Sequence, residues 1–327
     1  MASEFWSLIT ALFVSNMLSG CQTVSAPPTR TPKAVFIIID GIPADVLETT
    51  ATPNLDEISR AGGYTRAYVG GVPGEVSQSP TDSAVGYNSL LTGTWSYKHN
   101  VWDNDINDPN YAYWDIFRIA KSHDPSLQTA IFSTWTDNRT RLLGDGLAAA
   151  GGNKLDYHVD GFELDTARFP HDALGNYIRD IDRLVTYEAA RYIDEKGPDL
   201  SWIYLEHTDD VGHRYGDGPE MTAAVKLMDE QVGRIWAAVR HRQHAHDEDW
   251  LILVTTDHGR DEQTGKEHGG HSDRERTTWI ATNSRRLNAH FDETPAIVDI
   301  LPSLATHLRL SLPGKIGDQL DGRSFIE

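Results

Sequence analysis

The stretch KAVFIIIDG, residues 33–41, decides the fold class of this chain. It is a continuous apolar run rich in β-branched residues, which is typical of a central parallel strand covered on both faces. The run ends in an acid, Asp40, which is therefore expected at the carboxyl end of the strand. Because open α/β sheets bind their ligands outside the carboxyl ends of their strands, Asp40 is the first candidate site residue.

Further apolar runs with the character of strands follow along the chain, and helical periodicity lies between them. Strands that alternate with helices predict an α/β fold, a doubly wound and mostly parallel sheet with helices on both faces. Residues 33–327 are expected to form a single domain, because neither an internal repeat nor a convincing interdomain linker is present. The expected strands are residues 129–135, 200–206, 250–257 and 277–282, and the clearest expected helices are residues 178–196 and 220–240.

The amino-terminal residues are expected to be an export signal and not part of the fold. Residues 5–20 form an apolar run that is short for a membrane span and fits the core of a signal peptide. It ends in LSGC, which resembles the bacterial lipobox, so residues 1–21 are expected to be a lipoprotein signal peptide with Cys21 as the lipidation site. The alternative is a free thiol near the terminus. Residues 22–32, rich in Pro, Thr and Ser, are expected to be a flexible tether.

These features predict an exported protein of a bacterial cell envelope, which contacts the membrane only through the lipid anchor. The 327 residues carry 29 Lys and Arg against 48 Asp and Glu, a formal net charge of −19 at pH 7. This balance argues against nucleic-acid binding, because a basic surface is needed to displace counterions from phosphates. A phosphorylated substrate would need a local positive centre, and a bound metal is a candidate for it.

Aspartates and histidines gather directly after expected strands. Asp209 and His213 lie four residues apart in TDDVGH, and Asp257 and His258 are adjacent at the end of an expected strand. Carboxylate oxygens and imidazole nitrogens are the ligands that zinc takes in catalytic sites, which keep one coordination position open. An Asp and a His at either spacing are more often polar residues at the protein surface. Their joint placement at strand ends indicates a metal site.

A further donor is expected in KEHGGHSDRER, residues 266–276, from either His268 or His271. Asp40 adds a carboxylate from the first strand. So many carboxylates and histidines at one sheet edge would be costly to bury without a cation, which supports two bound metal ions.

PTDSAVGYNSLLTG, residues 80–93, places Ser83 in a turn before an expected helix. A serine at such a position is ordinarily an N-cap, because its hydroxyl accepts from backbone N–H groups of the first turn. The same geometry offers a helix N-terminus to a phosphate, and a serine hydroxyl bound to metal there could act as a nucleophile. Both interpretations remain open from the residues alone.

In this order the motifs resemble those of the alkaline phosphatase superfamily, most closely its type I phosphodiesterase/nucleotide pyrophosphatase branch. The resemblance runs from about Lys33 to the carboxyl terminus and implies an alkaline-phosphatase-like catalytic domain. The segments that carry it are Asp40 after its strand, TPNLDEISRAGG at 52–63, Ser83 with TG at 92–93, YLEHTDDVGHRYG at 204–216, TTDHG at 255–259 and EHGG at 267–270.

The resemblance implies two zinc ions and a set of ligands for each. His268 is preferred over His271 because the late ligand of the family commonly sits in an HG or HGG step. Asn104 lies where this branch carries an asparagine that binds a phosphoryl oxygen, although an asparagine in WDNDINDPN could also be a turn residue. The implied ligands are, for the first zinc, Asp209, His213 and His268 and, for the second zinc, Asp40, Asp257, His258 and the nucleophile Ser83.

The implied activity is zinc-dependent hydrolysis of phosphoesters through a phosphoseryl intermediate. A phosphodiesterase or nucleotide pyrophosphatase that acts on a small phosphorylated substrate is favoured. The segment Thr81-Asp82-Ser83-Ala84 departs from that branch and is closer to alkaline phosphatases that cleave monoesters. An alkaline phosphomonoesterase and a phosphonate hydrolase of the same superfamily therefore remain alternatives, and a metal-binding lipoprotein without catalysis is a third.

Overall fold

The computed structural model describes Met1 and residues 30–327. The expected signal peptide, the expected lipidation site Cys21 and most of the expected tether lie outside the described residues. Contacts between residues group Thr31–Glu327 into one unit.

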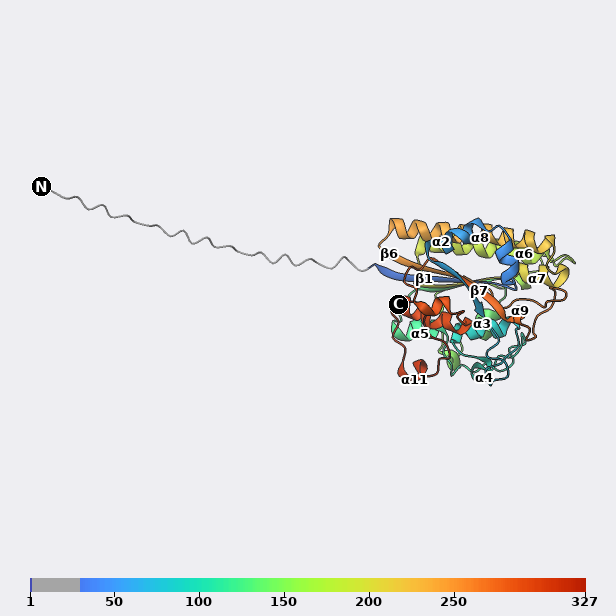
Figure 1. Ribbon diagram of the computed structural model, residues 1–327, viewed down its shortest axis with the longest axis horizontal. Coiled ribbons are helices and arrows are strands. Elements are labelled where there is room, and N and C mark those ends of the chain that lie inside the picture. Colours follow the sequence, from blue (N-terminus) through green and yellow to red (C-terminus); the bar gives the residue numbers. More distant parts are fainter. Residues whose placement is uncertain (2–29) are drawn as a thin grey trace. The chain divides into compact units, whose positions relative to one another are not determined.

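This unit is built on one sheet of seven strands in the order β2-β7-β6-β1-β5-β3-β4 (Figure 1). The strands β6, β1, β5, β3 and β4 run parallel to one another, whereas β7 is antiparallel to both β6 and β2. The predicted α/β fold with a mostly parallel sheet is confirmed. The strand bounds are β1 Thr31–Ile39, β2 Gly63–Tyr68, β3 Thr129–Ser133, β4 Tyr157–Val159, β5 Leu200–Leu205, β6 Glu248–Thr255 and β7 Thr277–Thr282.

The central strand β1 explains why KAVFIIIDG has no polar face. Its alternate side chains enter two different hydrophobic clusters, with Phe36 and Ile38 in one and Ile37 and Ile39 in the other. The strand begins earlier than expected, because Thr31 and Pro32 pair with Glu248 and Asp249 of β6. The expected tether of residues 22–32 is therefore wrong at its last two positions, where backbone pairing holds the chain in the sheet.

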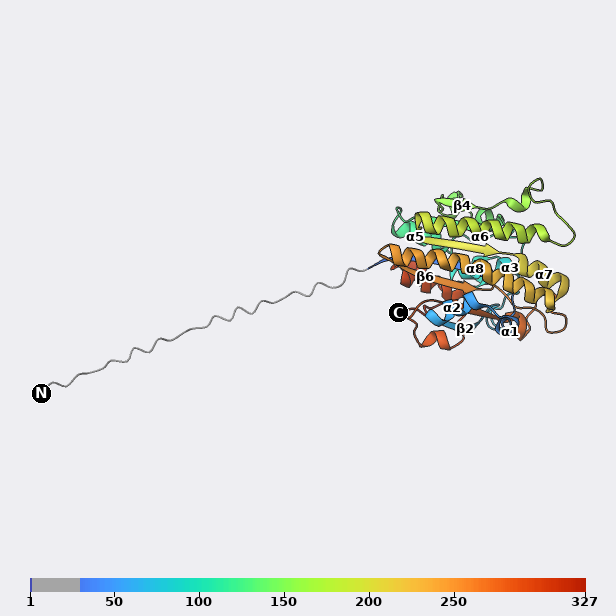
Figure 2. The ribbon, with the colours of Figure 1, turned by 90° about the horizontal axis from the view of Figure 1, so that it is seen from above.

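Helices cover both faces of the sheet (Figure 1). The helices α2, α6 and α8 pack on one face, and α3, α5 and α10 pack on the other. The α6 and α8 helices lie side by side along the sheet (Figure 2). The helix bounds are α1 Ala44–Thr49, α2 Pro53–Ala61, α3 Ser83–Thr92, α4 Ser96–His99, α5 Ile116–His123, α6 Asn176–Lys196, α7 His207–Tyr215, α8 Pro219–Ala245, α9 Asp273–Arg276, α10 Ile300–His307 and α11 Gly314–Gly317.

The two helices predicted from periodicity are confirmed as α6 and α8, and α8 continues past its predicted end at residue 240 to Ala245. Shorter helical turns lie at Asn138–Leu142, Ala148–Ala150, Phe162–Leu164, Ala289–Asp292 and Ile297–Asp299. Within the described part of the chain, every helix is too short or too polar to cross a membrane.

Candidate active site

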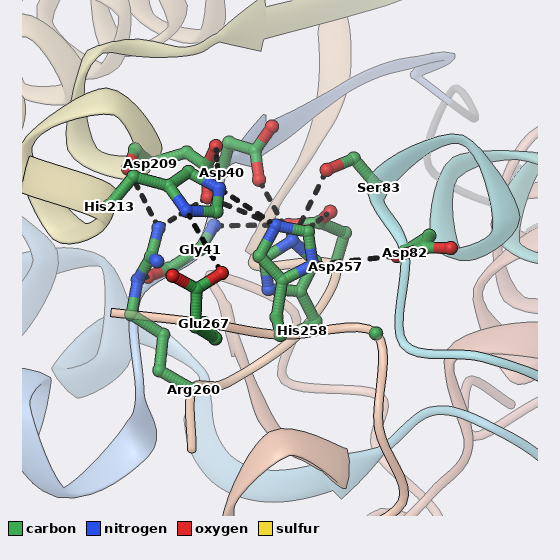
Figure 3. Close-up of polar contacts among 12 residues, drawn as sticks. Asp40, Gly41, Asp82, Ser83, Asp209, His213, Asp257, His258, Arg260 and Glu267 are labelled. Atoms are coloured by element: carbon green, nitrogen blue, oxygen red, sulfur yellow. Dashed lines mark hydrogen bonds and ion pairs between the residues drawn. The ribbon is translucent and has the colours of Figure 1, made fainter. Parts of the chain in front are cut away.

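Three neighbouring strands bring the expected site residues to one edge of the sheet. The strands β6, β1 and β5 are adjacent and parallel, so their carboxyl ends meet there. Asp40 directly follows β1, Asp257 follows β6, and α7, which carries Asp209, follows β5. The first residue of α3, Ser83, reaches the same edge (Figure 3).

The first group of possible metal ligands consists of Asp209, His213 and His268. Asp209 and His213 are four residues apart on α7, a spacing that places both on one helix face. The Nε2 atom of His213 lies 3.3 Å from Asp209 Oδ2 and 3.0 Å from His268 Nε2. The structure thus brings His268 into the group, whereas His271 is exposed and outside it.

The second group consists of Asp40, Asp257 and His258, and all three side chains are buried. The Nε2 atom of His258 lies 3.3 Å from Asp40 Oδ1 and 3.3 Å from Asp257 Oδ2. The two groups are adjacent, because the rings of His258 and His268 stack with their centroids 3.7 Å apart.

Ser83 lies where these groups meet, with its Oγ 3.2 Å from His258 Nε2. The N-cap interpretation of Ser83 is wrong, because Asp82 occupies the N-cap position and Ser83 is the first helical residue. Asn104 accepts a hydrogen bond of 2.9 Å from the backbone N–H of Ala84. A cavity of about 120 Å³ opens beside these residues and is lined by Asp40, Ser83, Tyr87, Asn104, Trp135, Tyr204, Glu206 and Asp209.

Backbone contacts orient two of the imidazole rings. The Nδ1 atom of His258 lies 2.8 Å from the carbonyl oxygen of Gly259, and Nδ1 of His268 lies 3.0 Å from that of Thr81. A carbonyl oxygen only accepts, so each Nδ1 carries the proton of its ring. Each Nε2 lone pair is then directed at the ligand groups, which is the arrangement that metal-binding histidines need.

Burial and mutual charge shift the pKa values of the second group. Burial, followed by the charge of Asp40, raises the pKa of Asp257 well above its usual range. Burial disfavours the imidazolium of His258, but the carboxylates of Asp257 and Asp40 raise the pKa of this histidine to about 9. Burial and the charge of His258 lower the pKa of His268 to about 3. The edge therefore carries an excess of negative charge that only a proton or another cation can offset.

Two buried oxygens show that the residues fit a metal ion. Among residues 30–327, Asp40 Oδ1 and Asp257 Oδ2 are buried and accept no hydrogen bond, and both face His258 Nε2. Two buried carboxylate oxygens without a donor would be costly, and a divalent cation removes that cost. Carboxylate and imidazole ligands suit zinc.

Three residues that support the ligands are not identified by the sequence analysis. The hydroxyls of Tyr87 and Tyr204 hydrogen-bond to Asp40 Oδ2, the second of them at 2.7 Å, and lie 2.9 Å from each other. The buried guanidinium of Arg260 binds the carboxylate of Asp209. The spacing of Tyr87 from Ser83, four residues on an expected helix, is a signal that could have found it.

We expect Tyr87→Phe to lower kcat/KM about 10-fold and to weaken metal binding by a similar factor, because groups that orient metal ligands contribute roughly 10–100-fold. The substitution removes one donor from Asp40 Oδ2 and leaves Tyr204 as the other. Steady-state kinetics and a chelator competition would measure both effects. Tyr97→Phe is a matched control, because the Tyr97 hydroxyl binds Asp321 and lies outside both ligand groups; equal losses in the two variants would contradict the role of Tyr87.

Comparison with known proteins identifies the family of this chain. The family model described as type I phosphodiesterase/nucleotide pyrophosphatase matches residues 34–303. A bis(5'-adenosyl)-triphosphatase of Xenopus laevis is 24% identical over 243 residues, which cover 73% of this chain and 49% of that protein. The chain spans about half or less of the length of the curated relatives it matches.

Solved structures share the fold at low identity. The phosphonate monoester hydrolase of Agrobacterium radiobacter superimposes with a TM-score of 0.60 at 16% identity, covering 90% of this chain and 76% of that one. Murine ectonucleotide pyrophosphatase/phosphodiesterase 5, an inactive variant in complex with AMP, gives a TM-score of 0.56 at 14% identity, covering 86% and 96% of the two chains. The family model covers most of the chain, residues 34–303, and the chain therefore belongs to the type I phosphodiesterase/nucleotide pyrophosphatase family, within the alkaline phosphatase superfamily.

Proposed function

We propose that this protein is a zinc-dependent phosphodiesterase that acts on a small phosphodiester or nucleotide through a phosphoseryl intermediate. The observation that carries the proposal is the position of Ser83 Oγ, 3.2 Å from His258 Nε2 at the junction of the two ligand groups. The names of the Xenopus triphosphatase and of the murine protein, and the AMP in the murine structure, support a nucleotide as substrate.

The two ligand groups would hold one zinc ion each. Zinc bound there would lower the pKa of the Ser83 hydroxyl and stabilise negative charge on the oxygen that leaves phosphorus. The residues that would hold the first ion are Asp209, His213 and His268, and those that would hold the second are Asp40, Asp257, His258 and Ser83.

Ser83 carries the covalent chemistry in this proposal. Its Oγ attacks phosphorus, a bond forms between Oγ and phosphorus, and the bond from phosphorus to the leaving oxygen breaks. Water then attacks the phosphoserine, the bond from phosphorus to Oγ breaks, and Ser83 recovers its hydroxyl. The start of α3 contributes a favourable dipole to the phosphoryl group.

Asn104 would bind a phosphoryl oxygen during both steps. Its Oδ1 accepts from the N–H of Ala84, so the amide is oriented by the residue that follows the nucleophile. With Oδ1 engaged, Nδ2 is the atom that can donate to an equatorial oxygen in the cavity.

The charge of the cavity favours a diester over a monoester. Two of the three acids that line it, Asp40 and Asp209, would be metal ligands, and none of the described lining residues is lysine or arginine, so only the metal ions would supply positive charge. A phosphomonoester is a dianion near neutral pH and needs more positive charge than a monoanionic diester. The Thr81-Asp82-Ser83-Ala84 segment favours the second candidate, an alkaline phosphomonoesterase.

Side-by-side hydrolysis of bis-p-nitrophenyl phosphate, p-nitrophenyl phosphate and p-nitrophenyl phenylphosphonate by zinc-loaded protein tests the proposal. We expect kcat/KM for the diester to exceed that for the monoester about 10-fold, or about 1.4 kcal/mol in transition-state binding. Faster monoester cleavage would replace the proposal with a phosphomonoesterase, and faster phosphonate cleavage with a phosphonate hydrolase. Zinc binding without any hydrolysis would favour a metal-binding protein without catalysis.

The proposal includes a location in the bacterial cell envelope, with a lipid on Cys21 as the anchor. Its support is the apolar run of residues 5–20 that ends in LSGC.

A further inference from the structure

One arginine contacts segments that carry ligands of both groups. Arg260 is wholly buried. Its Nε donates to the carbonyl oxygen of Gly41 at 3.0 Å, its Nη1 to that of Lys266 at 2.7 Å, and its Nη2 to that of Asp209 at 2.8 Å and to Asp209 Oδ1. Gly41 follows Asp40, and Lys266 lies two residues before His268.

The guanidinium occupies a slot that two glycines leave open. A Cβ atom on Gly212 would lie 2.2 Å from the Cζ of Arg260, and a Cβ atom on Gly41 would lie 2.7 Å from its Nη2. Gly212 lies on α7 between Asp209 and His213. Any side chain at residue 212 would therefore displace the arginine from Asp209.

Arg260 fixes the orientation of the Asp209 carboxylate. Its Nη2 binds Oδ1, and Oδ2 lies 3.3 Å from His213 Nε2. Oδ1 also lies 3.7 Å from His268 Nε2. The arginine thus fixes the carboxylate with one oxygen toward each histidine of the group. A free carboxylate could rotate about its last torsion, which is a broad one.

Two side chains bind the peptide group between Lys266 and Glu267, in the loop that carries His268. Arg260 binds the carbonyl oxygen of Lys266, and the carboxylate of Asp261 accepts the N–H of Lys266 at 3.1 Å and that of Glu267 at 2.9 Å. The residue next to His268 is therefore fixed by two neighbouring charged side chains.

The second ligand group has supports that do not involve Arg260. The backbone N–H of Gly41 donates to Asp257 Oδ1 at 3.2 Å, and that of Ile42 donates to Thr256 Oγ1 at 3.1 Å. The indole of Trp279 donates to the carbonyl oxygen of Ile42 at 3.1 Å. Loss of the arginine should consequently affect the second group less than the first.

We propose that Arg260 is a positioning residue for the ligand group of Asp209, His213 and His268, which holds its zinc more weakly when the guanidinium is absent or displaced. The inference rests on the proposed function, because it takes both groups to bind zinc. The positive charge of Arg260 by itself repels a cation, so position and charge act with opposite signs on zinc affinity. The sign of the measured change decides between them.

Arg260→Lys separates the two effects, because lysine keeps the charge but its single ammonium cannot reach all four acceptors. We expect a 10–100-fold loss of affinity for one of the two zinc ions, measured by competition with a chromophoric chelator. The same variant in a His213→Ala background, where only the second group is complete, should bind its one zinc as His213→Ala alone does. Arg240→Gln is a control for charge change, because Arg240 is exposed and pairs with Glu57 on α2.

Gly212→Ala provides a second variant that keeps Arg260 itself. Alanine is the better helix former by about 1 kcal/mol, so weaker zinc binding in this variant would not come from helix propensity. It tests the inference if Arg260→Lys fails to fold, and melting of the metal-free proteins shows whether each variant is folded.

Three results would overturn the inference: unchanged affinity for both ions, a gain of affinity, or an equal loss in the His213→Ala background. Failure of the proposed function would be seen in the unsubstituted protein and not in the variants. In that case the unsubstituted protein would bind no zinc or, with zinc bound, would hydrolyse none of the test esters.

Discussion

Ser83→Ala abolishes turnover of a phosphodiester while both zinc ions stay bound; this is the largest effect we expect from one substitution. The hydroxyl supplies the attacking oxygen, and loss of a nucleophile lowers kcat by roughly 10⁴-fold or more. Zinc should remain because Asp40, Asp257 and His258 converge without Ser83, and the first group does not include it. Kinetics, zinc analysis and intact mass of the enzyme during turnover would measure the result, with a phosphorylated form in the unsubstituted protein alone.

Ser89→Ala is the matched control for this substitution. Ser89 lies on the same helix, but its hydroxyl donates to the carbonyl oxygen of Val85 and contacts His99. Its removal should lower stability by about 1 kcal/mol and leave turnover intact. Turnover by Ser83→Ala within 10-fold of the unsubstituted protein would remove Ser83 from the nucleophile role, and a loss of zinc would show that it acts mainly as a ligand.

The sequence predicts the sheet and much of the ligand set because these depend on local patterns. A short apolar run rich in β-branched residues, such as residues 33–41, favours a strand buried on both faces, and an acid at its end is then expected at the sheet edge. The pair Asp209 and His213 needs only the helix period to share a face. The residues alone left His268 and His271 open, because both lie in one loop whose path depends on distant contacts, and only the family resemblance favoured His268.

The residues that support the ligands are harder to predict from the sequence, because their positions depend on tertiary structure. Tyr204 and Arg260 meet the ligands only because β6, β1 and β5 are neighbours, and no local pattern gives that order. Arg260 has the sequence context of an exposed polar loop, yet it is wholly buried. The antiparallel direction of β7 is likewise absent from its apolar run, because a buried strand has the same composition in either direction.

Removal of zinc should reduce turnover to background. It should also make the free energy of unfolding of the metal-free protein depend on pH between 7 and 9. Chelation leaves Asp40 and Asp257 facing His258 without a cation, so His258 takes up a proton. The carboxylates of Asp257 and Asp40 raise the pKa of His258 to about 9, although burial acts against them. Metal-bound protein should lack this titration, because Nε2 of His258 is then engaged.

Whether stability rises or falls with pH depends on how each pKa differs between the folded and the unfolded chain. A histidine whose folded pKa lies above its usual value of 6.5 contributes stability that is fully present below pH 6.5 and is lost as the pH rises through about 9. The raised pKa of Asp257 acts in the same direction. Burial and the charge of His258 lower the pKa of His268 to about 3, which acts in the opposite direction but only below pH 6.5.

Urea unfolding at pH 6, 7, 8 and 9, with zinc and with chelator, would measure this dependence. Each pKa unit corresponds to about 1.4 kcal/mol, so the metal-free protein should lose roughly 3 kcal/mol over this range relative to the zinc-bound protein. Asp182, whose pKa burial raises to about 7, is outside both ligand groups and is present in both forms, so the zinc-bound curve serves as the reference for its titration. His258→Gln should remove the part of the difference that comes from His258, whereas His244→Gln, an exposed substitution on α8, should leave the difference unchanged. Parallel pH curves with and without zinc would mean that no cation replaces the proton between these carboxylates, and the two-zinc proposal would then fail at its second site.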